Sequence, residues 1–262
     1  MKNSYAEVDM RRKKIIRILE ENGLVKINKL SDELKLSPLT IRRDLNVMER
    51  ENLVKRFRGG AALIKMAADD NIFSSTLTLH KHAIARRAAL FVDDGDTIFI
   101  NTSSTALILL QYITAKQVTV ITNNARATNS KHRDDMIVVL TGGELRLPKE
   151  AMVGEFAINN LNRVVAVKSF LGCNGISIDG GLTTAVLQEA AVNELMLTRV
   201  TGRKFILADK TKVGCTLSFI YGSINQVSCL ITDTEASPGE VGKLRGLIDV
   251  IQVEPLVSGV TD

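Results

Sequence analysis

The sequence predicts two parts of different fold class: a small, mostly helical module over residues 1–63, and an α/β domain with a largely parallel sheet over residues 80–262. Short helical patterns and one basic hairpin pattern fill the first part. In the second part, β-branched runs alternate with helical patterns, an order typical of a parallel sheet with helices on both faces. Residues 64–79 lack clear periodicity, so we expect them to form the linker.

The basic charge of the chain is concentrated in its first part. Residues 1–65 hold 16 Lys and Arg against 9 Asp and Glu, a balance of +7, whereas the other residues hold 18 against 20, a balance of −2. A basic module on a near-neutral body indicates a polyanionic partner. The alternative is a basic surface that is merely solvated.

Composition narrows the class of protein. A hydrophobic fraction of 45% and a charged fraction of 24% are those of an ordinary globular chain. The three cysteines are far apart, which argues against a disulfide framework or a metal site and fits a reducing cytosol. Because no signal-peptide pattern opens the chain and its uncharged stretches are broken by polar residues, we expect a cytoplasmic protein without membrane spans or cofactors.

Three helices are predicted in the first part. The first covers Glu7–Glu21 and is amphipathic. The second covers Lys29–Leu34, with Asn28 as its N-cap. The third covers Pro38–Glu51 and has a strong start, because Ser37 can accept a bond from a free amide and proline suits the first helical position.

The third helix has two distinct faces. Ile41, Leu45 and Met48 recur at i, i+4 and i+7 and form the buried stripe. On the opposite face, Arg43 is placed to donate two bonds to guanine and Asn46 to pair with adenine. Three residues near the helix N-terminus are placed for phosphates or nearby base edges: Ser37, Thr40 and Arg42. The alternative is that the two arginines pair with Asp44 and Glu49 on a solvated helix.

A basic hairpin follows this helix. Residues 53–57 alternate in character and continue through a glycine turn into residues 61–63, a strand–turn–strand pattern. Three helices and such a hairpin form a winged helix-turn-helix, whose third helix enters the major groove of DNA. The wing residues expected to contact the DNA backbone or minor groove are Lys55, Arg56, Arg58, Gly59 and Gly60.

These motifs resemble the signature of the DeoR family of bacterial repressors. Residues 37–45 match the family pattern S-x-x-T-I-R-R-D-L, and residues 54–61 match its wing. One departure is Arg58, where the family usually has histidine, and this additional fixed charge should strengthen nonspecific binding to DNA. The resemblance extends over about residues 7–233, because short motifs of the second part also follow the family order: residues 94–99, 122–124, 142–144, 180–184, 189–190 and 208–212.

The resemblance implies a fold for the second part similar to ribose-5-phosphate isomerase and glucosamine-6-phosphate deaminase. It also implies that this domain binds phosphorylated sugars or related metabolites, which release the repressor from DNA. The strands expected from the sequence are Thr97–Ile100, Val118–Thr122, Ile137–Thr141, Ser169–Gly172, Lys204–Ala208, Cys229–Thr232 and Val250–Val253. The expected helices are His80–Val92, Thr105–Ile113, Asn124–Lys131, Thr184–Val200 and Gly239–Leu247.

Two polar loops follow predicted strands and open predicted helices, where backbone amides and the helix dipole favour an anion. Their residues are Asn101, Thr102, Ser103, Ser104 and Thr105 in the first loop, and Thr122, Asn123 and Asn124 in the second. Simple capping of the helices is an equal alternative. Gly142 and Gly143 mark a tight turn or a close approach to a ligand.

Five further residues complete the expected effector site. Thr183 and Thr184 can reach a ligand or cap the next helix. Lys212 is placed to bind the charge of a polyol phosphate, and Asp209 and Glu189 to bind its hydroxyls. A plain salt bridge among these charged residues is the alternative.

Two departures from the family pattern concern this site. Asn101 stands where the family has aspartate, and Ser103 stands where it has glycine. We therefore expect an anion site whose ligand differs from the family norm. His80, His82 and His132 are expected in exposed, polar surroundings, with no metal or catalytic role.

The sequence thus favours a ligand-responsive repressor of a carbohydrate operon that binds double-stranded operator DNA. We expect a dimer or tetramer, because such operators are usually repeated half-sites. One alternative is a sugar-phosphate isomerase or deaminase with a DNA-binding head. Another is an architectural protein whose second domain only oligomerises.

Overall fold

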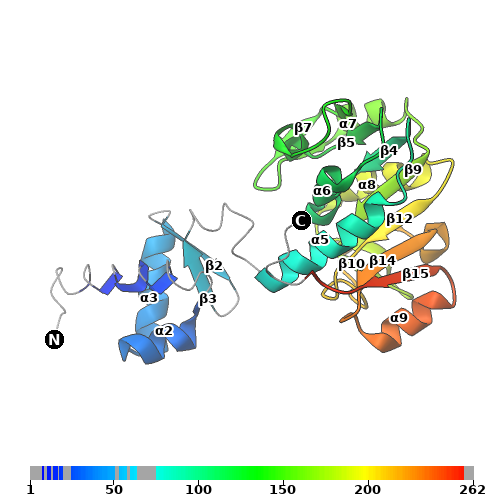
Figure 1. Ribbon diagram of the computed structural model, residues 1–262. Coiled ribbons are helices and arrows are strands. Elements are labelled where there is room, and N and C mark those ends of the chain that lie inside the picture. The colour runs from blue at the N-terminus through cyan, green and yellow to red at the C-terminus, as the bar shows by residue number, and fades with distance from the viewer. Residues whose placement is uncertain are drawn as a thin grey trace. The chain divides into compact units, whose positions relative to one another are not determined.

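The computed structural model describes residues 8, 11–12, 14–16, 18–19, 25–50, 53–57, 60–63 and 75–256. They belong to two compact units that divide after Thr78, and each is described by itself (Figure 1). The helix α5 (Ser75–Ala89) begins within the range expected to form the linker, and it continues past this division into the second unit. Among the described residues, no helix has both the length and the apolar character needed to cross a membrane.

The N-terminal unit contains two complete helices and a small antiparallel sheet. Its elements are β1 (Val25–Lys26), α2 (Ile27–Leu34), α3 (Pro38–Arg50), β2 (Val54–Phe57) and β3 (Gly60–Leu63), and the strand order is β1-β3-β2. The described residues between 8 and 19 are helical as well. Asn28 is not an N-cap: α2 begins at Ile27, which is buried, and its N-cap is Lys26 without a side-chain bond.

The core of this unit confirms the predicted stripe of the third helix. Ile41, Leu45 and Met48 are fully buried, and they pack with Leu30 of α2 and Val54 of β2. Because three positions of α3 face this core, the residues on its other side are left for solvent or a partner.

The C-terminal unit is built on a seven-stranded parallel sheet with the order β15-β14-β12-β9-β4-β5-β6. These strands are β4 (Thr97–Ile100), β5 (Thr119–Thr122), β6 (Ile137–Leu140), β9 (Lys168–Gly172), β12 (Lys204–Leu207), β14 (Cys229–Asp233) and β15 (Asp249–Val253). All seven strands expected from the sequence are present in this sheet. Its parallel pairing confirms the predicted fold class.

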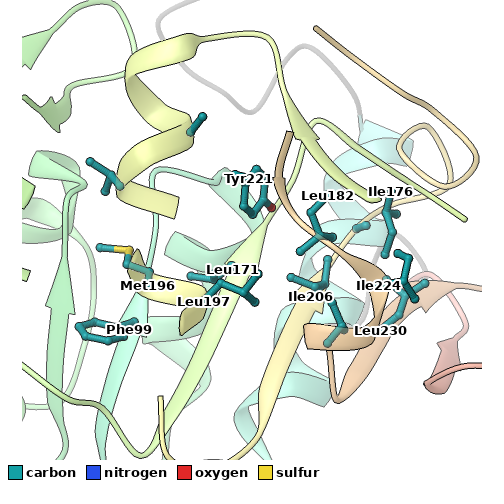
Figure 2. Close-up of a cluster of buried hydrophobic side chains, with 14 of the residues drawn as sticks. Phe99, Leu171, Ile176, Leu182, Met196, Leu197, Ile206, Tyr221, Ile224 and Leu230 are labelled. Atoms are coloured by element: carbon teal, nitrogen blue, oxygen red, sulfur yellow. The ribbon is translucent and has the colours of Figure 1, made fainter. Parts of the chain in front are cut away.

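Both faces of the sheet are buried under helices, so successive residues of a strand belong to different cores. Phe99 and Ile206 pack on one face together with Leu197 of α8 (Leu187–Thr198), as Figure 2 shows. Ile98 and Phe205 pack on the other face. The remaining helices are α5 (Ser75–Ala89), α6 (Ser104–Leu109), α7 (Glu155–Leu161) and α9 (Pro238–Arg245), with short 3-10 helices η1 (Leu110–Tyr112), η2 (Ala125–Asn129) and η3 (Ile224–Gln226).

Several short strands lie outside the parallel sheet and were not expected. They are β7 (Glu144–Arg146), β8 (Ala151–Val153), β10 (Gly175–Ser177), β11 (Gly181–Thr184) and β13 (Phe219–Gly222). β7 and β8 form an antiparallel hairpin over residues 144–153, and the other three form a separate sheet. Thr184 therefore ends a strand instead of beginning a helix, and α8 starts three residues later, at Leu187.

The chain order reverses in the middle of the parallel sheet. From β4 the chain moves outward to β5 and β6, and from β9 it moves the other way to β12, β14 and β15. β4 and β9 are neighbours, so their carboxyl ends form the topological switch point, where open α/β sheets bind ligands.

Candidate functional site

The start of α3 is fixed by its own first residues. Ser37 Oγ accepts a hydrogen bond from the Thr40 amide at 3.2 Å and lies 2.9 Å from Thr40 Oγ1. Ser37 is thus the predicted N-cap. The Thr40 hydroxyl has a local partner, and the cap sets the position at which the helix presents its outer face.

The outer face of α3 carries exposed polar residues. Arg42, Arg43 and Asn46 are exposed. Asp44 is buried and bonded to Arg11, with its two carboxylate oxygens 2.5 and 2.9 Å from Nε and Nη2. The alternative in which Asp44 pairs with the neighbouring arginines is therefore wrong. In the described part of the chain, the ion pairs of Asp44 are with Arg11 and Arg12.

The wing is described only in part. Lys55 and Arg56 lie in β2, but their side chains are outside the described residues, as are Arg58 and Gly59 entirely. At Gly60 a Cβ atom would lie 2.6 Å from the Val25 carbonyl oxygen. This glycine is thus required by the approach of β1, whatever it contributes to DNA binding.

The candidate effector residues of the C-terminal unit lie at or near the carboxyl edge of the parallel sheet. Asn101 follows β4, Asn123 follows β5, Gly142 follows β6 and Asp209 follows β12. Parallel strands present these ends on one side of the sheet. The structure therefore brings to one edge loops that are more than a hundred residues apart in sequence.

Asn101 joins the two strands of the switch point. Its Nδ2 donates to the Gly172 carbonyl at 2.9 Å and to Asn193 Oδ1 at 3.0 Å. Its Oδ1 accepts from the Gly172 amide at 3.0 Å and the Ser103 amide at 3.3 Å. The side chain is buried and uses all four of its hydrogen-bonding positions within the protein. Asn101 positions the site instead of offering a free group to a ligand.

The loop after Asn101 is also engaged locally. Ser103 Oγ accepts from the Ala106 amide at 3.4 Å and caps α6. A Cβ atom at Gly172 would lie 2.0 Å from this hydroxyl, so the loop passes directly against β9. In the same loop Thr102 is half-buried, Ser104 is exposed and Thr105 is buried.

The second loop shows the same use of polar groups. The Thr122 hydroxyl accepts from the Asn124 amide at 3.0 Å, and Asn124 Oδ1 accepts from the Arg126 amide at 3.2 Å, which caps η2. Asn123 is fully buried and its Nδ2 donates to the Met152 carbonyl at 3.1 Å. Among the described residues its Oδ1 has no hydrogen-bond partner. This buried acceptor is the unsatisfied group of the loop.

The helix α8 presents two site residues on one face, because Glu189 and Asn193 are four positions apart. Asn193 bonds Asn101, and Glu189 bonds Lys149, whose Nζ lies 3.0 and 3.1 Å from the two carboxylate oxygens. Thr184 Oγ1 lies 3.5 Å from the same carboxylate. The ion-pair partner of Glu189 is thus Lys149, which the sequence did not indicate, and not Lys212.

Lys149 comes from the β7–β8 hairpin, which follows β6 in the chain and bonds the loop after β5. Gly142 and Gly143 make the turn into this hairpin with φ of +70° and +108°. A Cβ atom at Gly143 would lie 2.4 Å from the Val153 carbonyl oxygen. The two glycines are therefore explained by backbone geometry, and the residue that the hairpin delivers to the site is Lys149.

The remaining two positions differ in availability. Thr183 is buried within β11, where its hydroxyl donates to the Gly175 carbonyl at 3.1 Å and accepts from the Leu217 amide at 3.1 Å. Lys212 is half-buried in the turn after Asp209, and its amide donates to the Asp209 carbonyl at 2.9 Å. One oxygen of the Asp209 carboxylate accepts from the Thr211 amide at 3.0 Å.

Cys173 directly follows β9 at the same edge. Burial raises the pKa of its thiol to about 12, although the nearby Lys212 ammonium acts in the opposite direction. The thiol is therefore neutral at physiological pH.

The expected exposure of the histidines is wrong. His80 is fully buried, with Nδ1 3.1 Å from Asp233 Oδ1 and Nε2 3.6 Å from Glu235 Oε1. His82 and His132 are half-buried. His80 is buried because α5 begins five residues earlier than expected, at Ser75. His80 therefore lies within the helix, on the same inner face as Ile84, which follows it by one turn. In the residues that the structure describes, no cluster of His, Cys, Asp and Glu could hold a metal ion.

Family models match both units. The DeoR-like helix-turn-helix domain matches residues 11–67, and the DeoR C terminal sensor domain matches residues 77–234. The HTH-type transcriptional regulator YulB of Bacillus subtilis is 31% identical over 90% of this chain and 92% of its own length. The glycerol-3-phosphate regulon repressor of Escherichia coli is 28% identical over 90% of this chain and 93% of its own length.

The solved structures that resemble this chain include ribose-5-phosphate isomerases, as expected. The enzyme from Neisseria gonorrhoeae has 16% identity and a TM-score of 0.38 over 53% of this chain and 54% of its own. The sorbitol operon regulator SorC from Klebsiella pneumoniae has 13% identity and a TM-score of 0.40 over 92% of this chain and 100% of its own. On the two matching domains, the chain belongs to the DeoR family of helix-turn-helix transcriptional regulators.

Proposed function

We propose that this regulator represses a carbohydrate-utilisation operon and leaves its operator when a phosphorylated sugar or related metabolite binds the C-terminal unit. The observation that carries the proposal is the exposed polar face of α3 beside a rigid helical core. Arg42, Arg43 and Asn46 project from a helix whose other side is fully buried. A side chain presented by a rigid helix loses little entropy when it binds a base edge.

The effector is proposed to bind at the carboxyl edge near the switch point. Lys149 and Lys212 supply positive charge there, and the buried Asn123 oxygen and the Glu189 carboxylate supply acceptors for hydroxyl groups. A polyol phosphate offers both kinds of partner: an anion for the lysines and hydroxyl donors for the acceptors. The names of two relatives refer to a phosphorylated polyol and to sugar uptake: one is a glycerol-3-phosphate regulon repressor and the other a lactose phosphotransferase system repressor.

A catalytic role for this edge is less well supported. General acid–base catalysis needs a carboxylate held against the substrate and free to exchange a proton. Both Glu189 oxygens are bonded to Lys149, and one Asp209 oxygen is bonded to the Thr211 amide. We therefore propose a sensor and not an enzyme. Turnover of any sugar phosphate by the purified protein would revive the enzyme alternative.

The effector proposal is tested by a thermal-shift screen against phosphorylated sugars and their unphosphorylated counterparts. A ligand present at 100 times its Kd should stabilise the folded chain by about 2.7 kcal/mol, which is readily visible as an increase in Tm. The expected result is stabilisation by at least one phosphorylated compound, and loss of that shift in the Lys212→Met variant. Stabilisation by none of a broad panel would favour the architectural alternative.

A further inference from the structure

One edge strand of the parallel sheet, β6, lacks the residues that usually protect such an edge. β6 is the last strand on that side and pairs, within the described residues, only with β5. Its sequence is Ile-Val-Val-Leu, without charge, proline or glycine. Edge strands of soluble proteins usually carry a charged residue or a proline. These residues discourage the exposed backbone N–H and C=O groups of the edge from pairing with another chain.

The opposite edge of the same sheet differs. β15 contains Asp249, which forms an ion pair with Arg203 at 2.9 Å, and Gln252, which accepts from Arg245 at 2.8 Å. These side chains give that edge the usual polar protection. The lack of protection is thus a property of β6 in particular.

The apolar character continues from β6 to its neighbours. Ile137 and Val139 are 60% and 42% exposed and lie on the same face of the sheet, two residues apart. Phe156 of α7 is 76% exposed and is one turn before Asn160, whose side chain bonds the Thr141 carbonyl at the end of β6. Leu145 follows the glycine turn into β7 and is 53% exposed. We call these four side chains and the β6 backbone the β6 surface.

The size of the β6 surface is sufficient for a contact between two copies. If a large side chain presents on the order of 200 Å² when fully exposed, these fractions correspond to roughly 500 Å² of apolar area. Two copies would then bury about 1,000 Å², the lower limit for a specific interface, before any contribution from the strand backbones.

We propose that the β6 surface is the contact between two copies of this chain. In a two-fold contact the same patch meets itself, so β6 would pair antiparallel with β6 of the second copy and join the two sheets. Aliphatic side chains then cover aliphatic side chains, and the free backbone groups of both edges find partners. The proposal does not depend on the identity of the effector or of the operator.

Sedimentation of the full chain at about 10 μM tests this contact. Val139→Lys puts a charge on the strand face at a half-exposed position, as natural edge strands do, and should not impair folding. We expect the mass of the wild-type particle to be at least twice the 28.7 kDa of one chain, and the mass to halve in Val139→Lys. The matched control is Leu247→Lys, since Leu247 is 55% exposed outside the β6 surface, and it should keep the wild-type mass.

A folded Val139→Lys variant with the wild-type mass would overturn the proposal, and so would a monomeric wild type. If Val139→Lys fails to give the wild-type far-UV spectrum, Phe156→Ser replaces it, with the same expected and contrary results. DNA binding is measured in parallel. Loss of the dimer with retained binding to a single half-site supports the contact, whereas failure of the wild type to bind DNA would count only against the proposed function.

Discussion

Asn101 shows how one side chain can hold a ligand-type loop in place. Its amide group donates to Gly172 and Asn193, and only an amide can donate and accept at the same time in this arrangement. A carboxylate at the same position would face the Gly172 carbonyl oxygen without a proton to share. The asparagine at position 101, where the family resemblance implies aspartate, thus fits its two acceptors, Asn193 Oδ1 and the Gly172 carbonyl of β9.

We expect Asn101→Asp to destabilise the folded chain by about 1–3 kcal/mol, because it removes the donor to Asn193 Oδ1 and places a carboxylate oxygen against the Gly172 carbonyl, which keeps only the bond from the Tyr221 hydroxyl among these side chains. The measurement is urea unfolding at pH 7, and the midpoint should fall while the slope stays constant. Asn159→Asp, at an exposed position of α7, is the matched control and should change little. Equal stability of the two variants would contradict the role given to Asn101.

The cysteines should differ strongly in reactivity. Burial raises the pKa of Cys173 to about 12 and of Cys229 to about 11, whereas Cys215 is exposed. Since only the thiolate attacks a disulfide reagent, one thiol should react quickly at pH 8 and the other two only after unfolding. Cys215→Ser should remove the fast phase. Three fast thiols in the folded wild type would contradict the raised pKa values of the other two.

The same two pKa values predict a pH effect on stability. Both thiols ionise near pH 9 when unfolded and only at higher pH when folded, so above pH 9 the unfolded state binds fewer protons. The free energy of unfolding should therefore fall as the pH rises from 9 towards 11. Replacing Cys173 and Cys229 by alanine should reduce this slope, and an unchanged slope would assign the effect to other groups.

The sequence could predict those site residues whose partners are close to them in the chain, and it missed those whose partners are far away. The Ser37 cap lies within three residues of its partner, so serine before proline was enough to predict it. Lys149 and Asn193 reach the site from a hairpin and a helix that are 40 and 92 residues away from their partners. No local pattern indicates such a contact, because only the folded sheet brings the segments together.

At the scale of elements, the β7–β8 hairpin is held over the carboxyl edge by two kinds of contact. Asn123 and Met152 exchange hydrogen bonds at 3.1 and 2.7 Å at the base of the hairpin. Lys149 bonds Glu189 on the far side of the site, on α8. The hairpin thus bridges both sides of the switch point, and a ligand that binds there must contact it or displace the lysine.

A double-mutant cycle should measure the bridge. We expect Lys149→Met to cost more stability than Glu189→Gln, because the carboxylate that remains is 7% exposed whereas the lysine is 45% exposed. The coupling free energy between the two should be about 1 kcal/mol, given the partial exposure of the lysine. Chemical unfolding of the four proteins gives this value, and a coupling of zero would mean that the ion pair does not hold the hairpin.

The elements also show which local structure was predictable. The seven parallel strands are short and mostly aliphatic, and the inner ones are buried on both faces, so their hydrophobicity predicted them. β7 and β10 are three residues long, are rich in charge or glycine, and owe their strand geometry to their partners. α7 is a single short helix after Gly154, too brief to give a clear periodic pattern.

At the scale of the whole molecule, one chain contains a DeoR-like helix-turn-helix domain and a DeoR C terminal sensor domain. The matching domains establish the family. Each unit has its own hydrophobic core: clusters on the two faces of the parallel sheet in the C-terminal unit, and a cluster around Ile41, Leu45 and Met48 in the N-terminal unit. The central claim is that α3 reads operator DNA through Arg42 and Arg43.

The most direct test is the anisotropy of a labelled duplex from the region upstream of the gene, titrated with the full chain at several salt concentrations. The account predicts tight binding that weakens steeply with salt and exceeds binding to a scrambled duplex by at least a thousandfold. The Arg42→Ala/Arg43→Ala double variant should lose that preference, whereas Arg163→Ala, an exposed arginine of the other unit, should keep it. Equal binding of both duplexes by the wild type, or an unchanged preference in the double variant, would contradict the account.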